Sequence, residues 1–141
     1  MKLRYFSDIH LEFIKPNKMR ALLRHITNID PCDVLVLAGD IGNPYSDNYR
    51  DFITHINAIF PKTFIISGNH EYYNKYPMKN TTEHMETLIQ NYKNISFLNN
   101  KCEIYNDHCF IGTTLWSHIS HPQYEINDVY NIQNFDYKKY N

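Results

Sequence analysis

Apolar residues along this chain follow two different spacings, which predict an alternating series of strands and helices. Short apolar runs at 3–6, 33–38 and 63–67 are typical of buried strands. Between these runs, apolar residues recur three and four positions apart, as on one helix face: Met19, Leu22, Leu23 and Ile26, then Tyr49, Phe52, Ile53, Ile56, Ile59 and Phe60. This order predicts a β-α-β-α-β arrangement with a parallel sheet.

The second half of the chain has shorter elements. A third helix is expected to begin at Thr81 or Thr82, because either residue can cap a helix, and its apolar face would carry Met85, Leu88, Ile89 and Tyr92. Runs at 95–98, 102–105 and 108–111 predict a meander of short strands. The last two would be joined by a tight hairpin turn at 106–107. No clear period follows residue 113.

The overall composition limits the class of protein. The chain has 141 residues, 43% hydrophobic and 21% charged, as expected for one globular domain spanning residues 1–141. Its net charge of -1 gives no electrostatic argument for nucleic-acid binding. No apolar run reaches the roughly 20 residues of a membrane span, and Asp8 comes too early for a signal peptide. Three cysteines without a CxxC pair favour free thiols and a cytoplasmic location.

Each of the first three predicted strands runs directly into a polar segment. These segments are Ser7-Asp8-Ile9-His10, Gly39-Asp40-Ile41-Gly42-Asn43 and Gly68-Asn69-His70-Glu71. The carboxyl ends of parallel strands lie along one edge of the sheet, where open α/β sheets bind ligands. We therefore expect one crevice to collect the polar side chains of Asp8, His10, Asp40, Asn69 and His70.

The types of side chain in this set indicate a metal. Two carboxylates, two imidazoles and an amide suit Mn, Fe, Zn or similar ions, and no thiolate is present to suggest a structural zinc. Taken singly, each residue also fits an ordinary turn, cap or surface role. Their coincidence at three matching strand ends favours a metal site. His25, His55 and His84 lie within predicted helices and are interpreted as solvated.

The three polar segments carry the patterns D-x-H, G-D-x-x-[DN] and G-N-H-[DE], in that order and each just after a strand. With them the sequence resembles the calcineurin-like metallophosphoesterase superfamily from Met1 to about Trp116. This resemblance implies an α/β/β/α fold, in which two sheets pack face to face with helices outside. It also implies a phosphate-ester substrate and two divalent metal ions that activate a water for in-line attack.

The resemblance assigns a role to each motif residue. Asp8 and His10 would bind the first metal, Asp40 would bridge both metals, and Asn69 would bind the second through its amide oxygen. His70 would be the catalytic group, donating a hydrogen bond or proton near the phosphoryl or leaving-group oxygen.

Outside the metal ligands, the resemblance places Asn43 and Glu71 as supporting residues. The family takes its remaining histidine ligands from a later strand end and from a Gly-His-x-His motif, and neither occurs in this sequence. The expected domain is therefore incomplete, truncated at its C-terminus, with one metal or partial occupancy as an alternative to two. Missing strands would also leave an apolar sheet exposed and favour self-association.

Three functional hypotheses follow. The first is a metal-dependent phosphoesterase that hydrolyses a phosphomonoester or phosphodiester, with manganese among the candidate metals. The second is a catalytically weak or inactive relative that binds metal or phosphate as a regulatory module. A Rossmann nucleotide binder comes third, because no GxGxxG follows the first strand.

Overall fold

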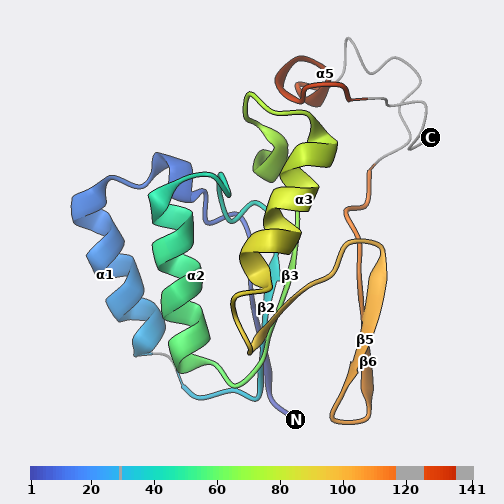
Figure 1. Cartoon of the computed structure of the whole chain (residues 1–141). Coiled ribbons are helices and arrows are strands. Elements are labelled where there is room, and N and C mark those ends of the chain that lie inside the picture. Colours follow the sequence, from blue (N-terminus) through green and yellow to red (C-terminus); the bar gives the residue numbers. More distant parts are fainter. Residues whose placement is uncertain (29, 117–125, 136–141) are drawn as a thin grey trace.

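The computed structural model describes residues 1–28, 30–116 and 126–135. Its centre is a sheet with strand order β1-β2-β3-β4, in which every neighbouring pair is parallel. The strands span β1 (Leu3–Phe6), β2 (Val34–Ala38), β3 (Thr63–Ile66) and β4 (Ile95–Phe97). The connecting helices α1 (Pro16–Thr27), α2 (Asp47–Ile59) and α3 (Met78–Ile89) all cover one face of this sheet (Figure 1).

The core forms because alternate strand residues point to opposite faces. Leu35, Leu37 and Ile65 are fully buried against the helices. Val34 and Phe64 point the other way, toward the antiparallel hairpin of β5 (Lys101–Tyr105) and β6 (His108–Gly112). The resulting layers are helices, parallel sheet and hairpin, which confirms the predicted metallophosphoesterase-like α/β fold class.

Two details of the predicted elements are wrong. The strand after Asn94 pairs in parallel with β3, so β4 completes the main sheet and does not begin a meander. Helix α3 begins at Met78, with Pro77 at the N-cap position, where the missing N–H of proline removes no helical hydrogen bond. Thr82 does not cap it, since its hydroxyl donates to the carbonyl of Met78 within the helix, at 3.1 Å.

Short helical turns follow two of the strands that lead to the predicted site. The 3₁₀ helices η1 (Leu11–Phe13) and η2 (His70–Tyr72) come after β1 and β3. The short helix α5 (Asp128–Asn131) lies near the start of α3, where the Met78 N–H donates to the carbonyl of Gln133 at 3.3 Å (Figure 1). The sequence also places His118 and His121 three residues apart, a spacing that a metal could use, but both lie outside the described residues.

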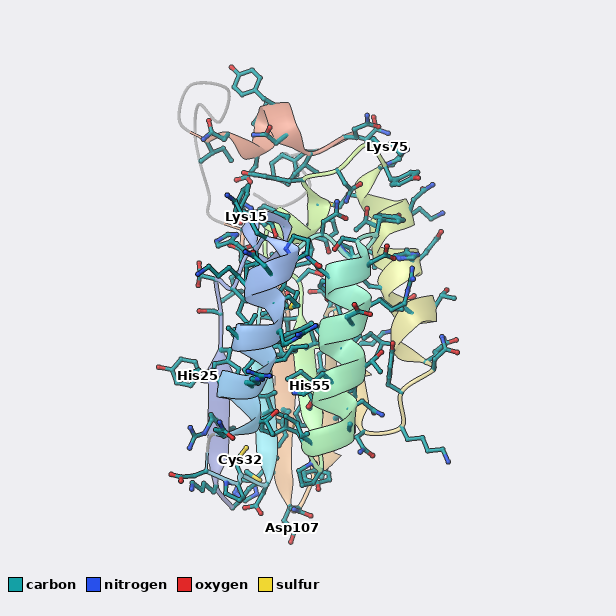
Figure 2. The ribbon with its side chains drawn as sticks, turned by 90° about the vertical axis from the view of Figure 1, so that its left-hand side faces the viewer. Lys15, His25, Cys32, His55, Lys75 and Asp107 are labelled. Atoms are coloured by element: carbon teal, nitrogen blue, oxygen red, sulfur yellow. The ribbon has the colours of Figure 1, made fainter. Side chains whose placement is uncertain are left out.

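The carboxyl ends of the strands define one end of the molecule. In the side view, Lys15 and Lys75 mark this end, and Cys32 and Asp107 mark the other (Figure 2). The predicted motif segments all follow strands at the first end. His55 belongs instead to the α1–α2 interface, where its Nε2 lies 2.8 Å from the Thr27 hydroxyl.

The sheet surface is only partly covered. On the hairpin side of β1, Leu3 and Tyr5 are exposed, and the outer face of the hairpin exposes Ile104 and Ile111, at 75% and 79%. These four residues are called the open apolar face below. Within the described ranges, no helix is long and apolar enough to cross a membrane.

Candidate metal centre

Three side chains from the predicted set converge at the carboxyl edge of the sheet. His10 precedes η1, Asp40 follows β2 and His70 begins η2. One potential ligand atom of each residue lies within 4.8 Å of the others. The two imidazole rings are 4.4 Å apart, edge to face at 72°. We call these three residues the ligand trio.

The turns that follow β1 and β2 are joined by backbone hydrogen bonds. The His10 N–H donates to the carbonyl of Asp40 at 3.0 Å, and the Asp8 N–H donates to that of Gly39 at 3.2 Å. Asp8, His10 and Asp40 all have left-handed backbone conformations, with φ values of 53°, 52° and 54°. Aspartate and histidine adopt this conformation more readily than most residues other than glycine. Left-handed residues gathered at a cluster of polar side chains are typical of functional sites.

The turns that follow β2 and β3 contact each other at Gly39 and Gly68. A Cβ atom at Gly39 would lie 2.8 Å from the backbone nitrogen of Gly68. At Gly68, a Cβ would lie 2.7 Å from the backbone nitrogen of Asp40 and would also collide with its carboxylate. Glycine at positions 39 and 68, just after β2 and β3, therefore lets these two turns approach each other closely. The Asp40 Oδ1 then accepts a hydrogen bond from the His70 N–H at 2.9 Å.

Glu71 connects these turns from inside the protein. Its carboxylate is fully buried and accepts four backbone N–H bonds: from Asp40 and Gly68 at Oε2 (3.0 and 2.6 Å), and from Ile41 and Gly42 at Oε1 (2.7 and 3.2 Å). Burial raises the pKa of Glu71 to about 7, while the four N–H bonds act in the opposite direction. Glu71 thus positions the Asp40 turn without facing the site.

Asn69 is held by Asp128, a residue that the three sequence motifs do not include. Its Nδ2 donates to the Tyr73 hydroxyl at 3.0 Å and to the Asp128 carboxylate at 2.8 Å. The Tyr73 hydroxyl donates to the same Asp128 oxygen at 2.7 Å. Burial, and then the hydrogen bond to Asp128, raises the pKa of Tyr73 to about 12. With Nδ2 engaged in this way, Oδ1 is the atom of Asn69 that remains for a cation.

The structure does not bring all predicted residues together. Asp8 is exposed and is not part of the ligand trio. Asn43 bonds within its own turn: its Oδ1 accepts from the Tyr45 N–H at 3.0 Å, and its carbonyl accepts from the backbone N–H of Ser46 at 3.0 Å. Ser46 then caps α2. These bonds explain how the second motif leads into the helix.

Glu12 is the second residue that the sequence pattern did not identify. Its Oε1 lies 3.0 Å from Nδ1 of His70 and 3.3 Å from Nδ1 of His10. A Cβ atom at Gly42 would lie 3.1 Å from Glu12 Oε2, so glycine leaves space for this carboxylate. The only available signal was its position two residues after His10 in a short helical turn.

The donor set of the ligand trio fits a divalent cation. Two imidazole nitrogens and one carboxylate oxygen suit zinc, iron or manganese. The amide oxygen of Asn69, a carbonyl-type donor, would suit the same ions. The residues present are therefore compatible with metal binding, and they do not select one metal among these.

Comparison with known proteins defines the class. The sequence profile of the calcineurin-like phosphoesterase family matches residues 1–141, and the chain belongs to this family. The resemblance inferred from the three motifs is thus confirmed. Metal binding is characteristic of this family, and its members act on phosphate esters.

Two individual proteins are similar to this chain. Uncharacterized protein L509 of Acanthamoeba polyphaga mimivirus is 37% identical over 150 residues, which cover 97% of this chain and 54% of that protein. The chain therefore spans about half the length of this relative. The crystal structure of phosphopantetheinyl hydrolase (PptH) from Mycobacterium tuberculosis matches with a TM-score of 0.56 and 19% identity, over 74% of this chain and 38% of that one. This second likeness concerns the fold alone.

Proposed function

We propose that this chain is a metal-dependent phosphoesterase that hydrolyses a phosphomonoester or a phosphodiester. The observation that carries the proposal is the ligand trio, which gathers at the ligand-binding edge of a calcineurin-like fold. Manganese, iron or zinc would fit these donors, with two ions expected for the family. The part of the substrate beyond the phosphate ester would be selected by loops outside the three motifs.

The proposed chemistry gives the residues distinct tasks. A bound divalent cation would supply positive charge for the phosphate and lower the pKa of a water. Asp40 contributes the negative charge of the trio, and Asp8, His10 and Asn69 are proposed as further ligands. His70 lies within the same 4.8 Å group, so it can reach an oxygen of a phosphate held there. We assign it the hydrogen bond or proton delivered to the leaving group.

A second candidate function is a binding or regulatory module without turnover. It is favoured by one observation: among the described residues, only three acidic or histidine side chains lie close enough to share an ion, and Asp8 is not one of them. Such a module would bind metal and phosphate and would release no product.

A hydrolysis assay with two histidine variants tests the proposal. The protein is loaded with Mn²⁺ and given bis(4-nitrophenyl) phosphate, and we expect metal-dependent release of nitrophenol. His70→Ala should lower the rate by about 100-fold or more, as is typical when an acid–base group is lost. His25→Ala is the matched control, since His25 is exposed on α1, and it should keep the rate (Figure 2). No hydrolysis with Mn²⁺, Fe²⁺ or Zn²⁺, despite measurable metal binding, would establish the binding module instead.

We also propose that a second copy of the chain covers the open apolar face. Exposed apolar side chains on an unpaired sheet face tend to associate in water. Light scattering on the purified protein should give a mass above that of one 16.9 kDa chain. Ile104→Lys combined with Ile111→Glu should shift the mass toward a monomer. A wild-type protein that stays monomeric at high concentration would refute this proposal.

The unpaired cysteines support a cytoplasmic location, which we propose for the chain. Cys32 is buried, while Cys102 and Cys109 are exposed on the hairpin, and none of the three forms a disulfide. Exposed free thiols persist in reducing compartments and are readily oxidised outside them.

A further inference from the structure

We propose that Glu12 is a positioning residue that fixes the ring orientation and tautomer of both site histidines. One carboxylate oxygen, Oε1, contacts Nδ1 of His70 at 3.0 Å and Nδ1 of His10 at 3.3 Å. The inference rests on the proposed function, since it concerns how these histidines face a cation or a phosphate. It adds a residue outside the three motifs.

The position of Glu12 is fixed by its surroundings. It lies in η1 next to Leu11, which is fully buried and whose N–H donates to the carbonyl of Ile41 at 2.8 Å. The Glu12 side chain is only 22% exposed, and its Oε2 is buried without a hydrogen-bond partner. Gly42 packs against that oxygen. The carboxylate is therefore enclosed by the first two turns and directs Oε1 to both rings.

The chemistry of a carboxylate then selects the tautomer. An ionised carboxylate oxygen only accepts hydrogen bonds, and one oxygen can accept two. A neutral histidine that meets this oxygen at Nδ1 must carry its proton there, which leaves Nε2 with a lone pair. Metal-binding histidines commonly use such a carboxylate partner to fix tautomer and orientation. Glu12 thus leaves Nε2 of His10 free to bind a cation, and leaves Nε2 of His70 free to take up the proton that it then delivers to the leaving group.

Nuclear magnetic resonance of the ring nitrogens tests this proposal without metal or substrate. Spectra of ¹⁵N-histidine-labelled, metal-free protein are recorded at about pH 8.5, above the ordinary pKa range of imidazole. We expect the Nδ1–H tautomer at both His10 and His70. If the wild-type protein shows the Nε2–H tautomer at both positions, the proposal is overturned, whether or not the chain hydrolyses phosphate esters.

Two substitutions at Glu12 separate positioning from a merely structural role. Glu12→Ala should shift both rings toward the Nε2–H tautomer and weaken Mn²⁺ binding by about 10–100-fold, the usual effect of losing such a partner. Glu12→Gln keeps an acceptor oxygen and should restore the wild-type tautomers. Glu83→Ala, at an exposed position on α3, is the control and should change neither readout. Unchanged ring tautomers in a folded Glu12→Ala protein would refute the assignment.

Discussion

Replacing Asp40 by asparagine is expected to lower the affinity for Mn²⁺ by at least about 100-fold, because loss of a residue that only supports a metal ligand already costs about 10–100-fold. Asp40 supplies the only carboxylate of the ligand trio, so the substitution removes its negative charge. The shape of the site is retained for two reasons. Asparagine keeps the Oδ1 that accepts from the His70 N–H at 2.9 Å, and it tolerates the left-handed backbone at φ 54°. We expect the free energy of unfolding to change by less than about 1 kcal/mol.

Titration calorimetry of Mn²⁺ into metal-free protein measures this effect. Asp107→Asn is the matched control, because Asp107 is also a left-handed aspartate, with φ 61°, and lies at the opposite end of the molecule (Figure 2). This control should bind Mn²⁺ like the wild type. Equal affinities for Asp40→Asn and Asp107→Asn would place the metal site elsewhere on the chain.

The convergence of His10, Asp40 and His70 could be predicted from the sequence because it follows from topology. A parallel sheet brings the ends of successive strands to one edge, and the apolar runs of this chain predicted β1, β2 and β3 within one or two residues. The polar side chains that directly follow these strands therefore lie at that edge. The prediction for this part of the site therefore needed no long-range detail.

The contacts of Glu12 and Asp128 could not be predicted in the same way. Glu12 reaches both histidines from a short turn that begins with His10 in a left-handed conformation, and periodicity in the sequence does not reveal the dihedral angles of single residues. Asp128 meets Asn69 across 59 residues of sequence, from a helix of four residues with no recognisable pattern. Such contacts depend on the path of the connecting segments.

The direction of β4 was mispredicted for a related reason. This strand has only three residues, Ile95–Phe97, and a short apolar run does not reveal whether it pairs in parallel or antiparallel fashion. Its direction is set by α3, which returns the chain across the sheet before the strand begins. The hairpin turn could be predicted because Asn106 and Asp107 favour the left-handed conformations that both adopt there.

Replacing Glu71 by glutamine is expected to lower the free energy of unfolding by about 2–4 kcal/mol at neutral pH. The carboxylate is fully buried, and all four of its hydrogen-bond partners are backbone N–H donors. A glutamine side chain offers one acceptor oxygen and one NH₂ group, so whichever way it is turned, N–H groups face N–H groups. The Asp40 turn would then lose two of its four bonds, and buried donors would be left without partners.

The pH dependence of stability gives a second readout. The folded-state pKa of Glu71 is about 7, raised by burial from an ordinary value of 4.5, so between these values the folded protein binds this proton more tightly than the unfolded chain. The stability that Glu71 contributes is fully present below pH 4.5 and is lost as the pH rises through about 7. Glutamine does not titrate and should lack this slope. The stability difference between wild type and Glu71→Gln should therefore narrow from about pH 5 to about pH 8.

Urea unfolding curves at several pH values measure both effects on metal-free protein. Glu83→Gln, on the exposed surface of α3, is the matched control and should stay within about 0.5 kcal/mol of the wild type. A Glu71→Gln protein as stable as this control would show that the four N–H bonds contribute little. A stability difference that widens toward high pH would show that the folded state favours the ionised carboxylate. In the first case the Asp40 turn would be held chiefly by the contact between Gly39 and Gly68, and in the second it would be held by the charged Glu71 carboxylate itself.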